Sequence, residues 1–437
     1  MNYPLNATQL DMLQEADPET LVTDYAVSVC IDIPAHCCSA DQLGAAVQTV
    51  LDTLHYTHVH LTRGGEDEVM VSEDNSMPNN VLMHQMSDEE WNRNRQQLIR
   101  PFSMLEEPGI RTHVVKTETR SILWHEFNHL FFDGMSMLGV LHAVEDVLEG
   151  RTLVDQGDIM AQWNTEERQS YDSTNYRRAK ADSINKFKGL RYTDICRKTD
   201  NPWGETLCGS YCLNTDSALN DRGVNSSLCT AAYALALAHE AGFFHTSSEG
   251  QREVFFMSTT HGRTDRRLHA GVLGNFMKSV SLRINVNLSQ TVEELLAQTR
   301  TALFRMMRNL SYPWTHLMRD LRLPPEQQVG TEMNISGMAI YEYMHLRGAT
   351  YPSYHIQIPR TRMHLLLVVQ QREEGLLFTA EGSSALYTPQ QLHSMARLTA
   401  LYTRLLSRDQ QRPLITVVGE ATKLHPLPQS FEASLTS

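Results

Sequence analysis

A histidine and an aspartate, four residues apart and followed by a glycine, form the part of this chain best suited to chemistry. Residues 128–134 read Asn-His-Leu-Phe-Phe-Asp-Gly, so the three residues are His129, Asp133 and Gly134. An imidazole whose pKa lies near neutrality can accept a proton from an amine or a hydroxyl group. We expect His129 to be the catalytic residue and Asp133 to brace its loop. Gly134 permits an unusual backbone angle or a close approach that a side chain would block.

The elements around this segment are expected to place it between a strand and a helix. Ile110 to Lys116 and Ser121 to Asn128 have the pattern of β-strands, and apolar residues from Met137 to Leu148 recur at helical spacing before Gly150. A loop between a strand and a helix can present its side chains to a cavity. The order of the elements supports the site more than the short string His-x-x-x-Asp-Gly does.

Two polar residues near this segment have structural explanations. Ser136 misses the Gly-x-Ser-x-Gly pattern of a nucleophile by one residue, so a role at the start of the helix explains it better. We expect no covalent nucleophile. His125 shares the strand face of His129 and is a candidate for lining the same cavity, although a hydrogen-bonded core histidine is the commoner case.

The composition describes a folded, acidic protein. The 437 residues are 41% hydrophobic and the net charge is −13, which disfavours a nucleic acid partner. The longest apolar run, Ala231 to Ala238, is far shorter than the roughly 18 residues of a membrane span. With no secretory signal visible, we expect a soluble, cytoplasmic protein. The seven cysteines show no spacing that zinc requires, so no metal site is expected.

Helices alternate with strands in both halves of the chain. Capping-box patterns at Ser39, Thr291 and Thr388 predict helices that continue to about Leu54, Met306 and Leu405. The remaining predicted elements are an alanine-rich helix at 226–239, strands at 58–61, 210–214, 253–258 and 363–370, and a polar helical connector at 151–185. Without a glycine-rich phosphate loop, this alternation predicts an α/β fold of two layered lobes, residues 1–172 and 173–437.

Four further segments occur in the order found in one known family. Residues 5–9, Leu-Asn-Ala-Thr-Gln, resemble its Leu-Ser/Thr-x-x-Gln opening, and residues 100–102, Arg-Pro-Phe, resemble its Pro-Phe-Asp element. Residues 274–283 resemble its Gly-x-Phe-x-Asn-x-x-x-x-Arg motif, with Lys278 in place of the usual Asn. Residues 309–314, Asn-Leu-Ser-Tyr-Pro-Trp, resemble its His-Gln-Asp-x-Pro-Phe motif.

The segment that contains His129 completes this series. It resembles the family's His-His-x-x-x-Asp-Gly motif, with His129 as the second His and Asn128 in place of the first. Gly262-Arg263 is similar to the pair that precedes the loop flooring the family's active-site tunnel, while residues 54–58 barely match its Arg-His-Glu-x-Leu-Arg motif. Nearly end to end, the chain resembles the condensation domains of non-ribosomal peptide synthetases, members of the chloramphenicol acetyltransferase-like superfamily.

The resemblance implies a specific fold and reaction. Two chloramphenicol acetyltransferase-like lobes would form a V, with His129 at the centre of a tunnel. The donor would be a thioester on the phosphopantetheine arm of an acyl or peptidyl carrier protein, or on coenzyme A, and no cofactor would be bound. The acceptor would be a small-molecule amine or alcohol, and the product an amide or ester of specialised metabolism. His129 would deprotonate the nucleophile, or hold it and the tetrahedral intermediate by hydrogen bonds.

The same resemblance implies roles for the surrounding residues. Asp133 and Arg283 would form an interior salt bridge, with Gly134 and Asn128 as further support for the site. The candidates for lining the tunnel or contacting substrate are Gly274, Asn275, Phe276, Ser136 and His125.

Three functional interpretations remain open at this stage. The first is a free-standing condensation enzyme, because no adenylation or carrier module fits in the remaining length, so a carrier would act in trans. The second is a coenzyme-A-dependent alcohol or amine acyltransferase of the same superfamily. The third is a catalytically inactive docking platform, to which the substitutions Asn128 and Lys278 would point. An epimerising relative is less favoured.

Overall fold

The structure is a computed structural model that describes residues 1–13, 22–23, 26–65, 68–74, 77–189, 201–214, 225–244, 252–269, 271–322, 331–336, 343–361, 364–372 and 375–426. Contacts divide the chain into two compact units. The first unit comprises Met1–Ser173, His261–Lys278 and Ala339–Pro359, and the second comprises Thr174–Thr260, Ser279–Met338 and Arg360–Ser437. Two segments that follow Ser173 in the chain thus pack with the first unit. The predicted lobe boundary, the V-shaped arrangement and the tunnel stay predictions.

The first unit is built on a six-stranded mixed sheet with the order β14-β15-β3-β9-β8-β6. Its strands are β3 (Ala26–Pro34), β6 (Leu82–Gln85), β8 (Ile110–Lys116), β9 (Arg120–Asn128), β14 (Tyr343–Leu346) and β15 (Ala349–Ile356). Its helices are α1 (Ala7–Leu13), α2 (Ala40–Thr53), α3 (Asp88–Asn94), α4 (Gly134–Leu148) and α5 (Ile159–Gln169). Smaller sheets join β1 (Asn2–Pro4), β5 (Val69–Glu73) and β4 (Val59–Arg63), and β2 (Val22–Thr23) and β7 (Phe102–Ser103).

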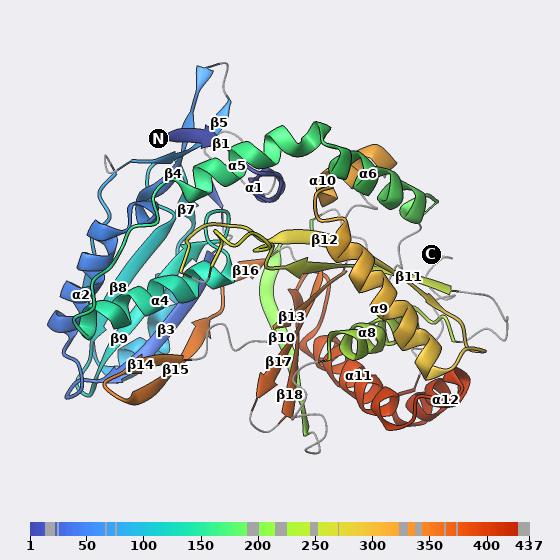
Figure 1. The fold of residues 1–437 in the computed structure, drawn as a ribbon. Coiled ribbons are helices and arrows are strands. Elements are labelled where there is room, and N and C mark those ends of the chain that lie inside the picture. Colours follow the sequence, from blue (N-terminus) through green and yellow to red (C-terminus); the bar gives the residue numbers. More distant parts are fainter. Residues whose placement is uncertain are drawn as a thin grey trace. The chain divides into compact units, whose positions relative to one another are not determined.

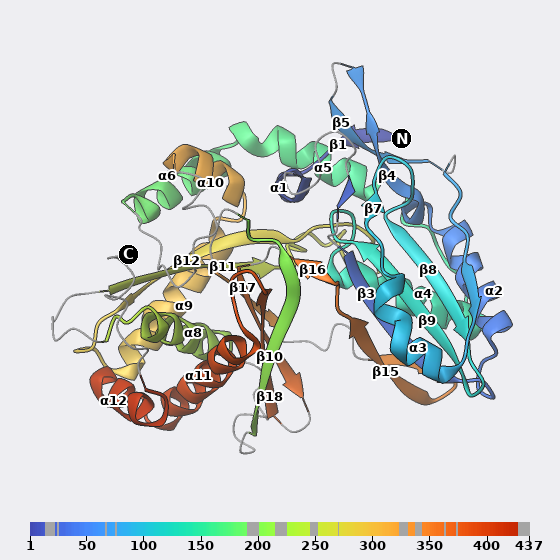
Figure 2. The same ribbon diagram turned by 180° about the vertical axis from the view of Figure 1, so that it is seen from behind.

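Both faces of this sheet are covered, and the residues of β9 show how. Leu123 and Phe127 face the core that includes residues of α2 and α4, which lie along one face of the sheet in Figure 1. Ile122 and Trp124 face a second cluster that contains Trp91 of α3, the helix seen on the other face in Figure 2. Alternate residues of a strand point to opposite faces, so the unbroken burial of β9 from Ser121 to Asn128 is the pattern of a strand covered on both sides.

The second unit is built on a seven-stranded sheet with the order β12-β11-β13-β17-β18-β10-β16. Its strands are β10 (Gly204–Asn214), β11 (Arg252–Thr260), β12 (Lys278–Val286), β13 (Thr331–Ser336), β16 (Arg360–Thr361), β17 (Leu365–Arg372) and β18 (Gly375–Ser383). Its helices are α6 (Thr174–Phe187), α8 (Ser226–Glu240), α9 (Val292–Arg308), α10 (Trp314–Leu321), α11 (Pro389–Arg408) and α12 (Leu414–Leu424).

Four of these helices gather on one side of the sheet. Helices α8, α9, α11 and α12 lie together in Figures 1 and 2 and share one apolar core with the strands. The alanine-rich helix α8 is buried almost all round, because its small side chains let it approach both the sheet and α11. Helices α6 and α10 lie beside one another in both views, and the Tyr176 hydroxyl of α6 lies 2.9 Å from His316 Nδ1 of α10.

The local signals predicted these elements well. The capping boxes expected at Ser39, Thr291 and Thr388 are confirmed, and the strand expected at Ile110–Lys116 has the same bounds in β8. The connector predicted at 151–185 contains α5 and α6. None of the helices in the described ranges has the length and apolar character that a membrane crossing requires.

Candidate active site

His129 lies in the tight turn that joins β9 to α4. The carbonyl of Asn128, the last residue of β9, accepts hydrogen bonds from the backbone N–H groups of Phe131 (3.1 Å) and Phe132 (3.2 Å). Asp133 is the N-cap of α4, and its side chain accepts from the N–H of Ser136 at 2.8 Å. An N-cap carboxylate satisfies a helical N–H that would otherwise lack a partner, so it fixes the start of the helix directly after the turn.

Three consecutive carbonyl groups of the turn each accept a hydrogen bond from a side chain elsewhere in the first unit. The Asn275 amide donates to the carbonyl of His129 at 2.7 Å. The Gln9 amide donates to the carbonyl of Leu130 at 3.2 Å, and the Tyr56 hydroxyl donates to the carbonyl of Phe131 at 2.9 Å. Because these hydrogen bonds fix the backbone of the turn, they also fix the position of the Cα atom from which the His129 side chain extends.

The environment of His129 favours its neutral form. Its Nδ1 atom is buried, although the residue as a whole keeps partial exposure. Burial lowers the pKa of His129 below its ordinary value, and the negative charge of Asp133 and hydrogen bonds with the backbone of His129 and Phe132 act in the opposite direction. A neutral imidazole carries one nitrogen lone pair, the group that a general base uses to accept a proton.

The carboxylate of Asp133 is saturated with hydrogen bonds. Arg263 donates to it through Nη2 (2.7 Å) and Nε (3.3 Å), and the backbone N–H of Phe276 donates at 3.2 Å. Ser136 adds its N–H and lies with its Oγ 2.7 Å from Oδ1. The side chains of Asp133 and Arg263 are only 4% and 3% exposed, so this is a buried ion pair with most of its hydrogen-bonding capacity filled. Such a carboxylate braces the turn, as the sequence predicted for Asp133.

The expected salt bridge between Asp133 and Arg283 is wrong. Arg283 lies on β12 of the second unit, where it pairs with Glu253 on the neighbouring strand β11 and donates to the carbonyl of Lys186 at 2.6 Å. The partner of Asp133 is Arg263, in the loop that follows β11. Strand β12 places Arg283 beside Glu253 on the adjacent strand, and the guanidinium of Arg283 forms its ion pair with that carboxylate.

Two glycines of this loop, and not Gly134, use conformations that other residues avoid. Gly262 has φ +63° and Gly274 has φ +153°, whereas Gly134 begins α4 and is absent from the residues with positive φ. A Cβ on Gly262 would lie 1.7 Å from the carbonyl oxygen of Phe276, and one on Gly274 would lie 2.6 Å from the Phe276 ring. Of the two uses predicted for Gly134, the unusual backbone angle is wrong, and the close approach stays a prediction; the special angles lie in the loop that contains Gly262 and Gly274.

Ser136 joins this loop to the start of α4. Its Oγ accepts hydrogen bonds from the N–H of Gly274 and from Arg263, both at 2.9 Å. It lies 2.5 Å from the carbonyl of Gly274 and 2.7 Å from Asp133, either of which can take its single proton. All hydrogen-bonding capacity of the Ser136 hydroxyl is thus taken up within the protein, in keeping with the role predicted for this residue at the helix start.

A buried network of amide side chains supports the turn from behind. The Asn6 amide donates to Asn164 Oδ1 and to the carbonyl of Asn275, both at 3.1 Å. Asn164 donates to Gln9 Oε1 at 2.8 Å, and Gln9 in turn reaches Leu130. Asn6, Gln9, Asn164 and Asn275 are all fully buried. A buried polar network is costly unless its groups are paired, and these pairs connect α1, α5 and the 261–278 segment to the His129 turn.

The other predicted site residues lie in the interior. Phe276 is fully buried, with the guanidinium of Arg263 4.6 Å above its ring. His125 is fully buried and within 2.8 Å of Thr112 Oγ1, and burial lowers its pKa to about 3, so it stays neutral. Asn128 Oδ1 accepts from the N–H of Leu130 at 3.0 Å, while its Nδ2 has no hydrogen-bond partner among the described residues.

A second buried chain of polar groups ends at the turn. The Tyr3 hydroxyl donates to the carboxylate of Glu73, and the Tyr56 hydroxyl, which interacts electrostatically with Glu73, donates to the carbonyl of Phe131. Burial raises the pKa of Glu73 to about 7, with the Tyr3 hydrogen bond acting in the opposite direction. Tyr56 also makes an edge-to-face contact with Phe132, with ring centroids 5.4 Å apart. The buried polar groups Glu73, Tyr3 and Tyr56 therefore lie behind the turn, and Tyr56 contacts it directly through the Phe131 carbonyl.

The comparison with known families identifies this arrangement. Residues 1–398 match the family described as Condensation domain. The chain belongs to this family. Bacitracin synthase 3 of Bacillus licheniformis is 22% identical over 320 residues, which cover 71% of this chain and 5% of the synthase. Surfactin synthase subunit 2 of Bacillus subtilis (strain 168) is 23% identical over 312 residues, covering 68% of this chain and 8% of the subunit. The chain thus spans less than a tenth of the length of these relatives.

Solved condensation domains share the fold. A variant of the starter condensation domain of rhizomide synthetase, in complex with C8-CoA, superposes with a TM-score of 0.76 at 15% identity, covering 95% of this chain and 97% of that one. The first condensation domain of the calcium-dependent antibiotic synthetase, in complex with a substrate analogue, gives 0.76 at 14% identity, covering 95% and 98%. The predicted chloramphenicol acetyltransferase-like α/β fold is confirmed.

Sequence reasoning missed three residues of this site. Arg263 was noted only as part of a resembling pair, and its pairing with Asp133 needed the fold. Tyr56 lies in residues 54–58, the motif that matched the family poorly, so nothing drew attention to its hydroxyl. Asn164 lies in the polar connector, where one asparagine among many polar residues gives no signal.

Proposed function

We propose that this condensation domain is an acyltransferase that joins a thioester-activated acyl group to an amine or a hydroxyl group, with His129 as its catalytic residue. The observation that carries this proposal is the anchoring of the His129 turn, in which three successive carbonyls accept side-chain hydrogen bonds. Burial also keeps the imidazole neutral and able to accept a proton. A catalytic base needs both a fixed position and a suitable protonation state.

The proposed reaction transfers one proton from the nucleophile to the leaving thiol. The nitrogen or oxygen of the acceptor attacks the thioester carbonyl, and His129 takes the proton of the nucleophile or holds the nucleophile and intermediate by hydrogen bonds. The bond from carbon to sulfur then breaks, the amide or ester bond remains, and the thiol leaves with a proton. Asp133 takes no part in this transfer, because its carboxylate is filled by Arg263, Ser136 and Phe276.

The remaining roles follow from the contacts. Asn275 positions the His129 carbonyl, and Ser136 and Gly274 connect the helix start to the 261–278 segment. Asn128 closes the turn through its carbonyl and side chain. The donor that we propose is a phosphopantetheine thioester on a carrier protein or a coenzyme A thioester, and a small-molecule amine or alcohol is the acceptor. Support comes from the solved relative that holds C8-CoA.

Mass spectrometry of the reaction products tests this function. Acyl-pantetheine, acyl-CoA and carrier-bound acyl donors are each incubated with a panel of amines and alcohols, using the wild type, His129→Ala and His142→Ala. His142 is an exposed histidine of α4 and controls for the loss of an imidazole in the same unit. We expect a product with the wild type and His142→Ala that is lost with His129→Ala, and its mass reveals amide or ester. No product from any pair, with carrier binding unchanged in His129→Ala, would instead indicate a docking platform.

A further inference from the structure

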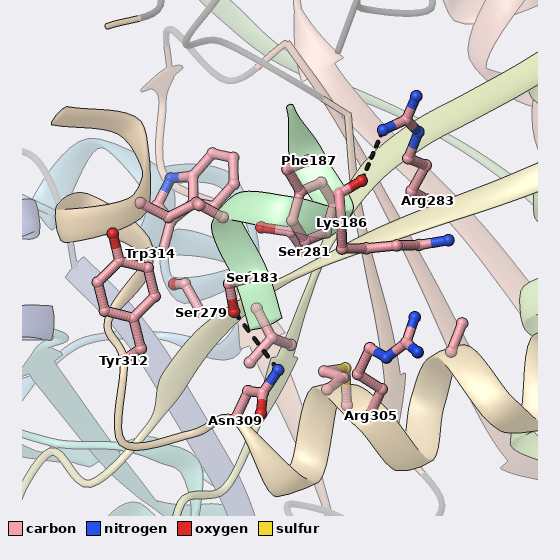
Figure 3. A pocket seen from close by; sticks show the side chains of 14 residues that line it. Ser183, Lys186, Phe187, Ser279, Ser281, Arg283, Arg305, Asn309, Tyr312 and Trp314 are labelled. Atoms are coloured by element: carbon pink, nitrogen blue, oxygen red, sulfur yellow. Dashed lines mark hydrogen bonds between the residues drawn. The ribbon is translucent and has the colours of Figure 1, made fainter. Parts of the chain in front are cut away.

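A cavity of ≈ 50 Å³ lies within the second unit, bounded by α6, β12, α9 and α10 (Figure 3). One side of it is basic, with Lys186, Arg283 and Arg305 among its lining residues. Its other lining residues are polar or apolar: Ser183, Phe187, Ser279, Val280, Ser281, Ala302, Met306, Asn309, Tyr312, Trp314 and Leu317. The protein as a whole has a net charge of −13, so a cavity lined by three cationic side chains differs from the acidic character of the rest of the chain.

Two of the three cations of this cavity pair with carboxylates, and the third, Lys186, forms no ion pair with a described residue. Asp182 pairs with Arg305 at 3.4 Å and also accepts from Asn309 at 2.7 Å, while Glu253 pairs with Arg283. No hydrogen bond or ion pair joins the Lys186 ammonium group to a described residue. In Figure 3 its side chain extends between the guanidinium groups of Arg283 and Arg305. The free cation thus lies next to two like charges.

Two further observations favour an anion-binding site. Burial, together with the positive charges of Arg305 and Arg283, lowers the pKa of Lys186, while the negative charges of Glu253 and Asp182 act in the opposite direction. The Nε–H of Arg283 is buried and has no hydrogen-bond partner among the described residues. Buried donors are normally satisfied, and a cluster of cations with an unused N–H is suited to an anion with several acceptor oxygens.

We propose that this cavity binds a phosphate group of the thioester substrate, with Lys186, Arg283 and Arg305 as its cationic partners. The proposal rests on the proposed function, because both possible donors, a carrier's phosphopantetheine arm and coenzyme A, bear phosphate. Ser279 and Ser281 supply hydroxyl groups to the same cavity. The adjacent rings of Tyr312 and Trp314 offer an apolar wall for the branched hydrocarbon next to the phosphate of phosphopantetheine.

Helix α6 extends the basic character beyond the cavity. It carries Arg177, Arg178, Lys180 and Lys186, and Lys188 follows it, whereas its single acid is Asp182 and Lys180 pairs with Asp320 of α10 at 2.6 Å. A carrier protein is acidic, and a basic helix beside the phosphate site offers it charge complementarity. The carrier-bound phosphate is therefore the source that we favour over coenzyme A.

Calorimetric titration tests the proposal without requiring turnover. The probes are 4′-phosphopantetheine, pantetheine, which lacks the phosphate, and coenzyme A, and the proteins are the wild type, Lys186→Gln, Lys423→Gln and His129→Ala. Lys423 is an exposed lysine of α12 in the same unit, so its substitution removes the same charge elsewhere. Thermal unfolding checks the fold, and since Lys186 lies beside like charges, Lys186→Gln is expected to keep full stability.

We expect the wild type to bind 4′-phosphopantetheine at least about tenfold more tightly than pantetheine, as a charge-assisted contact provides. Lys186→Gln should lose this preference, while Lys423→Gln and His129→Ala keep it. The affinity for coenzyme A then distinguishes the two sources of the phosphate, and either result supports the site. Weaker binding of coenzyme A than of 4′-phosphopantetheine indicates the arm of a carrier protein, and equal or tighter binding indicates a soluble donor. Equal binding of 4′-phosphopantetheine and pantetheine, no binding of either, or an unchanged preference in Lys186→Gln would overturn the proposal, whether or not acyl transfer is observed.

Discussion

Asp133 and Arg263 form a buried ion pair, with Asp133 Oδ1 2.7 Å from Arg263 Nη2. Asp133 caps α4 directly after the His129 turn, and Arg263 lies in the segment that follows β11 and also donates to the carbonyls of His269 (3.0 Å) and Val272 (2.8 Å). The pair therefore connects the helix that begins after the turn with the loop whose Asn275 holds the His129 carbonyl.

Breaking this pair should destabilise the protein strongly. Arg263→Gln leaves the Asp133 carboxylate buried without its cation, which costs about 3–5 kcal/mol of unfolding free energy. The control is Arg267→Gln, because Arg267 pairs with Glu166 and Asp265 at the surface, where a salt bridge is worth about 0–1 kcal/mol. Denaturant unfolding of both variants measures the difference. Similar losses in the two variants would show that the buried pair has no special role.

The backbone at Gly262 should not tolerate a side chain. Gly262→Ala places a Cβ 1.7 Å from the carbonyl oxygen of Phe276, in addition to the strain of a positive φ. Gly150→Ala is the control, because Gly150 has a similar φ of +76° with nothing within 4 Å of an added Cβ. Left-handed strain alone costs about 1–2 kcal/mol, and the clash should add roughly 1–3 kcal/mol at Gly262. Equal unfolding free energies of the two variants would contradict this.

Glu73 should make stability depend on pH. Its pKa in the folded protein, about 7, lies above the ordinary 4.5, so the folded state binds the proton more tightly and loses stability as pH rises from about 4.5 to about 7. Glu73→Gln removes this titration. We expect a smaller drop in Tm between about pH 5 and about pH 8 in Glu73→Gln than in the wild type or in Glu89→Gln, an exposed acid of α3. The same drop in all three would exclude Glu73 as the cause.

The pKa of His129 should appear in the rate of acyl transfer. Burial lowers this pKa below 6.5, so the imidazole remains neutral at pH values where an ordinary histidine is already half protonated. We expect the acid limb of the kcat/KM profile to have its midpoint below 6.5, measured with a donor and acceptor pair that yields product. A midpoint above 6.5 would mean that the ionising group is not a buried, neutral His129.

Local signals in the sequence predicted much of the fold. The capping boxes and the apolar periodicity act within a few residues, so α2, β8, β9, α9 and α11 could be placed from the chain alone. The pairing of β15 with β3, in which Ser353 lies opposite Ile31, joins residues more than three hundred positions apart. No local pattern specifies such a partner, and the placement of 339–359 in the first unit could not be predicted.

The candidate site divides in the same way. Adjacent residues predicted the strand, the loop with His129, and a helix that follows with Ser136 at its start; the N-cap at Asp133 came from the structure. The choice between Arg263 and Arg283 as the partner of Asp133 depends on how the chain leaves β11 at Gly262, which only the fold shows. The anchoring of the turn by Tyr56 likewise depends on a contact across the unit, since the residues around Tyr56 match no motif well.

The central claim is that His129 performs the chemistry of this condensation domain. The most direct measurement is the initial rate of acyl transfer by the wild type, His129→Ala and His142→Ala, after thermal unfolding has shown that all three are folded. A general base contributes about 100- to 10,000-fold, so we predict a loss of at least about 100-fold for His129→Ala alone. A rate for folded His129→Ala equal to that of the wild type would contradict the account.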